Sequence, residues 1–328
     1  MKYQETSFED YLKALDKYNM RPELDSLFKK LIAKNIGNTI FYGPPGSGKY
    51  SQMLNMLKGH SPSELKYQTK ITITTDKTDY SYLISDIHYE IDMNMLGCNS
   101  KTLWHELFLQ IVDIVFTKPE KHGYIVCKNF HTIHTELLET FYSYMQEYTT
   151  IHSHIGLNFI LITEELGFIP NNIINSCRVI NIAKPTKTEL MNIISKEHHQ
   201  HLMKLDITKQ NNIKMLIDVV SHKKSIPKDS MVTICNNIID LLREHENIKF
   251  MDLREQIYEL LTYNVDIISS IQYIIFNLLS DNKIEQYKIN DILDHSFISI
   301  KHFNNNYRPI YHIESILLYI TAKIYNYE

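Results

Sequence analysis

The sequence predicts an α/β domain with a parallel sheet, followed by two helical regions. The first observation is a phosphate-loop pattern between a short apolar strand and a helix, at 39–58. The second is the alternation of buried strand runs, at 124–127 and 158–163, with apolar helices. The third is the lack of strand alternation after about residue 185. Strands that alternate with helices around such a loop indicate a parallel sheet with the site at the strands' carboxyl ends.

The N-terminal segment 7–35 is predicted to be helical. Ser7 with Asp10 resembles a capping box, and Pro22 suits the first turn of a helix. Apolar residues within 24–32 fall at helical spacing and form one stripe. These features predict helical structure before the phosphate loop.

The loop has the G-x-x-x-x-G-K spacing of a phosphate-binding loop. Its glycines let the backbone wrap a phosphate with N–H groups pointing inward, and the positive end of the next helix faces the anion. Lys49 should reach the β- and γ-phosphates, unless it is only a surface lysine on an empty turn. Tyr50 stands where Ser or Thr would hold Mg²⁺, and Ser51 points about 100° further around the helix. The predicted nucleotide-binding residues are Gly43, Pro44, Pro45, Gly46, Ser47, Gly48, Lys49, Tyr50 and Ser51.

The other elements of the first domain follow from periodicity. The predicted segments are strands at 69–75 and 88–93, a helix at 103–116, a strand and helix within 122–148, a strand at 158–163 and a short strand before Ile182. Pro185 begins a region with helical pattern only, and apolar stripes continue from 246 to the end. The predicted domains are 1–184 (α/β, nucleotide-binding), 185–245 (a small helical lid) and 246–328 (all-helical, for oligomerisation).

Composition limits the function classes. The net charge of −4 gives no global basic field, so any DNA contact must be local. The four cysteines lie far apart without a C-x-x-C pair, which argues against a zinc ribbon or a disulfide scaffold. The N-terminus lacks the pattern of a signal peptide, and polar residues interrupt the C-terminal apolar helices. These features favour a soluble, intracellular protein with no membrane span.

Metal and DNA contacts receive no specific assignment. His198, His199 and His201 lack the Cys or Asp that would complete a ligand set, so no metal site is predicted. His131, His134, His152 and His154 are expected to be solvated or packed. The candidates for phosphate-backbone contacts are Lys70, Lys77, Lys101, Lys223 and Lys224, which as scattered lysines predict no defined interface.

Several motifs resemble the small subunits of sliding-clamp loaders, the replication factor C family of AAA+ ATPases. The stretch FYGPPGSGK matches closely, and Met145-Gln146-Glu147-Tyr148 matches the end of a family helix. An Ile-rich helix leads to Ser176-Cys177-Arg178, and HYEID at 88–92 is similar to a subunit type with little catalytic duty. The resemblance covers about 36–200. It implies an AAA+ domain with a parallel sheet, a helical lid and an all-α collar that packs into a ring.

The departures from the family pattern concern catalysis. Aligned by spacing, Lys128 occupies the position of the Mg²⁺-binding Asp, Asn129 that of the catalytic Glu, and Glu165 that of the sensor Asn. Arg178 is displaced by one residue from the arginine finger. Phosphoryl transfer relies on metal, positioned water and charge stabilisation, and loss of the base alone typically costs orders of magnitude. We therefore expect ATP or ADP as the ligand, no Mg²⁺, and deficient hydrolysis.

Two of these residues have open interpretations. Lys128 either stands in for Mg²⁺ near a phosphate or pairs with a local carboxylate, and we expect Glu164 or Glu165, on the neighbouring strand, to be that partner. Arg178 either reaches a neighbouring subunit or caps the helix at 171–175.

The resemblance implies a non-hydrolysing or weakly active clamp-loader subunit. Its partners would be other loader subunits, a sliding clamp and primer–template DNA, at a nuclear or viral replication site. The residue usage, rich in Ile, Asn, Lys and Tyr, indicates an AT-rich genome, as in some large DNA viruses. The alternatives are an active ATPase that uses Ser51, Asn129 and Glu164 or Glu165, an AAA+ scaffold of another DNA-processing assembly, and a small-molecule P-loop kinase.

Overall fold

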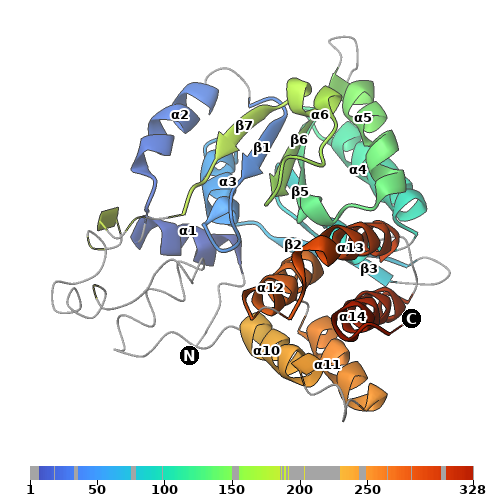
Figure 1. The fold of residues 1–328 in the computed structure, drawn as a ribbon. Coiled ribbons are helices and arrows are strands. Elements are labelled where there is room, and N and C mark those ends of the chain that lie inside the picture. The colour runs from blue at the N-terminus through green and yellow to red at the C-terminus, as the bar shows by residue number, and fades with distance from the viewer. Residues whose placement is uncertain are drawn as a thin grey trace. The chain divides into compact units, whose positions relative to one another are not determined.

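The computed structural model contains two compact units, 1–226 and 227–328 (Figure 1). The residues that the structure describes are 7–17, 19–32, 36–74, 79–97, 99–149, 155–184, 186, 188–189, 191, 203, 230–243, 249–263, 265–281, 283–303 and 308–327.

The first unit is built on a seven-stranded sheet with the order β2-β3-β4-β5-β6-β1-β7. The strands are β1 (Thr39–Tyr42), β2 (Thr69–Thr74), β3 (Asp79–Ile84), β4 (His88–Asp92), β5 (His122–Lys128), β6 (Gly156–Thr163) and β7 (Arg178–Asn181). From β4 to β7 all neighbouring strands are parallel, whereas β2 and β3 extend the sheet in antiparallel fashion. The predicted α/β domain with a mostly parallel sheet is confirmed. β3 is not among the strands predicted from the sequence.

Helices cover both faces of this sheet. They are α1 (Phe8–Lys17), α2 (Pro22–Ile32), α3 (Lys49–Lys58), α4 (Ser100–Thr117), α5 (Thr135–Thr149) and α6 (Asn171–Ser176), with short 3₁₀ turns at Met93–Leu96 and Phe130–Thr132. The Asp10 N–H donates to Ser7 Oγ at 3.2 Å, as the capping pattern predicts, and α2 begins at Pro22. The helical structure expected before the loop is therefore present, as two helices.

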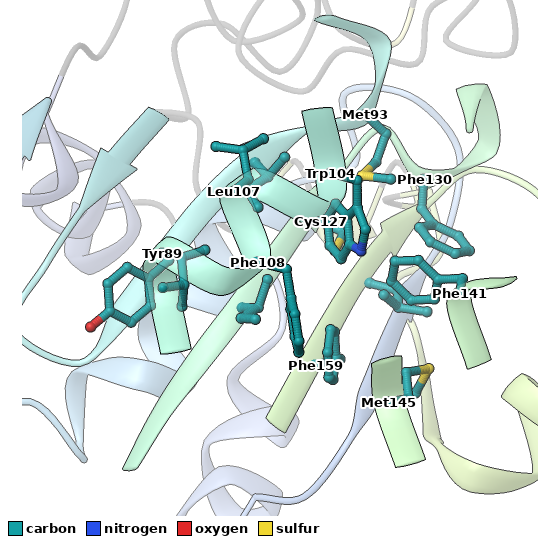
Figure 2. Close-up of a cluster of buried hydrophobic side chains, with 14 of the residues drawn as sticks. Tyr89, Met93, Trp104, Leu107, Phe108, Cys127, Phe130, Phe141, Met145 and Phe159 are labelled. Carbon is teal, nitrogen blue, oxygen red and sulfur yellow. The ribbon is translucent and has the colours of Figure 1, made fainter. Parts of the chain in front are cut away.

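Alternation along β5 separates the two core layers. Ile125 and Cys127 point into a core completed by α4 and α5, where Trp104, Phe108 and Phe141 pack (Figure 2). Tyr124 and Val126 point to the opposite face, where the core includes side chains of α1, α2 and α3. Successive strand residues face opposite sides of a sheet, so a strand buried on both sides reads as one apolar run.

The second unit is helical throughout its described residues. Its helices are α10 (Ser230–Arg243), α11 (Phe250–Thr262), α12 (Ile267–Ser280), α13 (Ile289–Phe303) and α14 (Ile310–Tyr325), with a 3₁₀ turn at Gln286–Lys288. All five helices contribute to one buried cluster rich in Ile and Leu. The apolar stripes that predicted this helical region thus find their partners inside the unit. None of the helices described here or in the first unit is long and apolar enough to cross a membrane.

Most of the predicted lid lies outside the described residues. The helix α10, which falls within the predicted lid at 185–245, packs against α11 and α12 in the second unit. The division into domains 1–184, 185–245 and 246–328 stays a prediction.

The sheet brings the phosphate loop close to two neighbouring strands. The loop follows β1, which lies between β6 and β7. The Gly43 N–H donates to Thr163 O at 3.4 Å, and the Ile182 N–H donates to Tyr42 O at 2.7 Å. A Cβ on Gly43 would overlap the carbonyl oxygen of Ile182. Glycine is therefore required at this position for packing against the end of β7.

This close approach gives a first prediction. Gly43→Ala must push the chain after β7 away from the loop, so we expect a loss of roughly 1–3 kcal/mol in the free energy of unfolding. Gly167→Ala is the control, because a Cβ at Gly167 meets no atom within 4 Å. Urea unfolding measures both variants. Equal stability of the two variants would contradict this account of Gly43.

Candidate nucleotide-binding site

The loop Gly43–Lys49 turns the chain from β1 directly into α3. Gly46 and Gly48 have φ angles of 70° and 90°, which side chains disfavour, and α3 begins at Lys49. The first N–H groups of a helix have no partner within it, and here they lie next to a glycine-rich turn. Such a turn binds anions in many proteins, because backbone N–H groups and the helix dipole favour negative charge.

Lys49 is held inside this loop. Its side chain is buried, and Nζ donates to Gly43 O at 2.7 Å and to Pro44 O at 2.8 Å. The carboxylate of Glu164 lies 3.8 Å from Nζ. Burial lowers the pKa of Lys49, and the charge of Glu164 only partly opposes that shift. The ammonium thus lies over the loop that was predicted to bind phosphate. The assignment of Gly43 to Ser51 as nucleotide-binding residues stays a prediction.

Glu164, and not Glu165, is the carboxylate next to the loop lysine. Glu164 is half-buried after the end of β6, and its second oxygen lies 3.9 Å from His131 Nε2. Glu165 is exposed, and its backbone N–H donates to Thr163 Oγ1 at 3.3 Å. The assignment of Glu165 to the sensor position rests on spacing alone and stays a prediction.

Lys128 forms its ion pair with Glu90, which corrects the expected pair with Glu164 or Glu165. The Lys128 Nζ lies 3.3 Å from Glu90 Oε2 and 5.4 Å from the centroid of the Tyr50 ring. The reason for the error is the direction of the side chain. Lys128 continues the Tyr124 and Val126 face of β5, so its stem points toward α3 and the neighbouring β4.

Glu90 is the centre of a buried polar group that we call the Glu90 cluster: Tyr50, Ser85, His88, Glu90 and Lys128. The Tyr50 hydroxyl donates to Glu90 Oε1 at 2.7 Å, and His88 Nε2 lies 3.2 Å from the same oxygen. Ser85 Oγ in turn contacts His88 Nδ1 at 2.5 Å. The side chains of His88 and Glu90 are fully buried, whereas that of Lys128 is 30% exposed.

The cluster keeps Glu90 ionised. Burial raises the pKa of Glu90, but the hydrogen bond and charge of His88, the charge of Lys128 and the hydrogen bond of Tyr50 outweigh it, so the pKa lies below its ordinary value. Burial and the adjacent Glu90 carboxylate raise the pKa of Tyr50 far above its ordinary value. Tyr50 therefore stays a neutral hydrogen-bond donor.

The amide of Asn129 is also engaged. Asn129 adopts a left-handed backbone conformation directly after β5, with φ of 51°. Its Nδ2 donates to Asp92 Oδ1 at 3.0 Å, and Asp92 ends the adjacent strand β4. Asn129 thus links the carboxyl ends of β4 and β5, where the family resemblance implies catalytic residues.

Arg178 lies at the other end of the sheet from the loop of its own chain. It is the first residue of β7 and pairs in register with Thr39, the first residue of β1. Its exposed side chain donates through Nη1 to Ile36 O at 3.4 Å. This contact replaces the expected cap of the helix at 171–175. Arg178 is positioned where it cannot serve its own loop, and its role toward a neighbour stays a prediction.

The remaining candidates add no site. Lys70 and Lys101 are exposed, and His131 and His134 are partly buried. The candidates that lie outside the described residues are Lys77, His152, His154, His198, His199, His201, Lys223 and Lys224. Within the described ranges, no group of three or more His, Cys, Asp or Glu side chains is arranged to hold a metal ion.

Glu90 was missed as a site residue in the prediction from sequence, whereas Glu164 was named there, with Glu165, as a possible partner of Lys128 and as a possible catalytic residue. The signal for Glu90 was present in HYEID, where His88, Glu90 and Asp92 alternate with Tyr89 and Ile91. In a strand buried on both faces, such alternation places a charge in the core and demands a partner. No comparable signal distinguishes Glu164 from Glu165, because both follow the strand directly.

Comparison with known proteins identifies structural similarity without a sequence family. No family model matches the chain, and no curated protein matches it by sequence. Cdc6p from Pyrobaculum aerophilum aligns over 97% of each chain, with 13% identity and a TM-score of 0.43. A RuvB variant from Thermotoga maritima aligns over 81% of this chain and 74% of its own, with 15% identity and a TM-score of 0.40. PCH-2 from C. elegans aligns over 65% and 60%, with 16% identity and a TM-score of 0.37. At these TM-scores the matches establish neither a family nor a function.

The Glu90 cluster predicts a pH-dependent loss of stability. Glu90→Gln removes the charge that balances Lys128, and we expect it to lower the free energy of unfolding by about 2–4 kcal/mol at pH 7. Because the pKa of Glu90 lies below the ordinary value of about 4.3, its contribution is complete above that pH and fades as the pH falls through the depressed pKa. The gap between wild type and the variant should therefore close in acid.

Urea unfolding at several pH values between 7 and 3 measures this gap. Glu139→Gln is the control, since Glu139 is exposed on α5. A gap that stays constant down to pH 3, or that is equally large for both variants, would contradict the role assigned to Glu90.

Proposed function

We propose that this chain is a nucleotide-binding AAA+ subunit of a clamp loader that hydrolyses ATP slowly or not at all. In this proposal it binds ATP or ADP at Gly43–Ser51 and helps other subunits to load a sliding clamp onto primer–template DNA. The predicted lid at 185–245 and collar at 246–328 would complete a ring-forming subunit.

The observation that carries the proposal is a formed loop beside substituted catalytic positions. The loop holds its buried lysine next to the start of α3, as anion binding requires. Lys128 and Tyr50, which stand where the family has metal ligands, form an ion pair and a hydrogen bond with Glu90. Asn129, which stands where the family has the residue that activates water, donates a hydrogen bond to Asp92. Side chains fixed in structural contacts are poorly placed to orient a metal or an attacking water.

The clamp-loader part of the proposal depends on the motif resemblance. FYGPPGSGK, Met145-Gln146-Glu147-Tyr148 and Ser176-Cys177-Arg178 are the residues that support it. The location of Arg178 at the sheet edge away from its own loop is consistent with a contact to a neighbouring subunit. In such a ring the arginine would contact the γ-phosphate of a neighbour.

One observation favours an active ATPase as the second candidate. Glu164 is a half-buried carboxylate that lies 3.8 Å from Lys49 Nζ and 3.9 Å from His131 Nε2. A carboxylate at this place has the chemistry of a base for an attacking water. Under the main proposal, the same carboxylate only neutralises Lys49 in the empty loop.

Binding and turnover of ATP by the purified chain test the main proposal. We expect saturable ATP binding, with a kcat far below roughly 1 s⁻¹, the lower end of the usual enzyme range. Lys49→Met should weaken binding at least about tenfold, because the loop loses its one buried ammonium. Lys58→Met, at the end of the same helix, is the control and should bind as the wild type does.

Glu164→Gln distinguishes the two candidates in the same assay. Under the main proposal it removes a competitor for Lys49 and strengthens ATP binding by about threefold to tenfold, with turnover still negligible. Glu165→Gln is the matched control. A wild-type kcat near or above roughly 1 s⁻¹ that Glu164→Gln abolishes would instead establish the active ATPase.

Co-purification from the host tests the clamp-loader assignment. Tagged full-length chain should recover other P-loop subunits and a ring-shaped clamp, identified by mass spectrometry, because a ring subunit buries its collar against its neighbours. Recovery of the chain alone as a stable monomer would contradict this assignment while leaving nucleotide binding intact.

A further inference from the structure

We propose that the loop binds its nucleotide without a divalent metal, with the Lys128 ammonium providing the positive charge that Mg²⁺ supplies elsewhere. This inference rests on the proposed nucleotide binding and adds the cation requirement of the same site. Its basis is a disagreement between the metal that the family resemblance implies and the residues that occupy the metal's positions.

The residues at these positions do not fit Mg²⁺. The ion is bound through oxygen acceptors, most often one or two carboxylates together with the phosphates. Lys128 brings a positive charge to the position of the carboxylate, and Tyr50 brings a phenol that donates its hydrogen to Glu90. The raised pKa of Tyr50 keeps the phenol protonated, so it offers no anionic oxygen. A cation placed here would meet donors and a like charge.

The same residues fit an anion. Lys128 reaches Glu90 with its ammonium while 30% of its side chain remains exposed, whereas Glu90 is fully buried. The ammonium lies 5.4 Å from the centroid of the Tyr50 ring, and Tyr50 is the second residue of α3. Lys49 supplies a second ammonium at the loop itself. One lysine thus begins α3 and the other contacts the side chain of its second residue, and positive charge near a helix N-terminus attracts phosphate oxygens.

Glu90 fixes the direction of the Lys128 ammonium. The carboxylate also contacts Tyr50 and His88, while 30% of the Lys128 side chain stays exposed to a ligand. Two other carboxylates lie nearby and act against binding: Glu164 beside Lys49, and Asp92, which accepts from Asn129. The positions expected to hold the metal offer a phenol that donates its hydrogen and an ammonium, so Mg²⁺ would gain no protein ligand there and ATP should bind without it.

The experiment titrates the full chain with fluorescently labelled ATP, once in EDTA and once in excess Mg²⁺. The fluorescence of the labelled nucleotide reports binding. We expect the wild type to bind ATP in EDTA at least as tightly as in Mg²⁺. This arm needs no variant, so a folding defect cannot affect it. A dissociation constant in EDTA more than about tenfold larger than in Mg²⁺ would overturn the inference and indicate that Asp92 or Glu164 binds a metal.

The role of Lys128 is tested by a matched pair of variants. Glu90→Gln and the double variant Glu90→Gln, Lys128→Gln differ only in the ammonium, and neither leaves a buried carboxylate without its partner. The double variant should bind ATP about fivefold to tenfold more weakly than Glu90→Gln in EDTA, with a smaller difference in Mg²⁺. Equal affinities in EDTA would overturn the role of Lys128. Absence of wild-type binding under both conditions would refute the proposed nucleotide binding itself, which separates the two failures.

Discussion

The structure around the loop depends on the burial of one ionised carboxylate, that of Glu90. An isolated carboxylate in a protein interior is penalised by several kcal/mol even after relaxation, so it survives only with partners. Tyr50, His88 and Lys128 come from α3, β4 and β5 and meet on it. The first turn of α3 and the edge of the sheet are thereby fixed relative to each other by one group. That turn carries the loop lysine at its start.

A buried ion pair is weak evidence for stability, because apolar side chains of similar size often serve equally well. The better explanation for the Glu90 cluster is specificity of position. A phenol, an imidazole and an ammonium can each satisfy the carboxylate only in a narrow range of directions. The cluster therefore fixes where Tyr50 and Lys128 point. Under the proposed function, in which both residues stand at metal-ligand positions, the cluster explains how these positions can change without disturbing the loop beside them.

Much of the fold could be predicted from the sequence. Each strand that is buried on both faces, such as β5 and β6, appears in the sequence as an apolar run. The phosphate-loop pattern identifies β1, the strand that the loop follows. The strand β3 was not predicted because its sequence, DYSYLI, mixes polar and aromatic residues. Its pairing with β2 depends on the tertiary structure, and no local sequence pattern indicates it. The partner of Lys128 was misjudged for a similar reason. Because β5 lies next to β6, we expected Lys128 to lie near Glu164, which follows β6. The pleat of β5 instead directs the Lys128 side chain toward α3 and toward Glu90 on β4, the other strand that neighbours β5.

The substitutions near the loop are linked, which single positions cannot reveal. Tyr50, Lys128 and Glu90 lie far apart in the sequence, and no local pattern indicates that their side chains meet. Under the proposed function, Tyr50 and Lys128 exchange the requirements of a metal site for those of an anion site, since donors stand where a cation needs acceptors. Restoring a metal ligand at one of these two positions would leave the donor at the other opposed to it. A return to metal-dependent chemistry would need several simultaneous changes, because each single change leaves either a buried charge without a partner or a cation beside an ammonium.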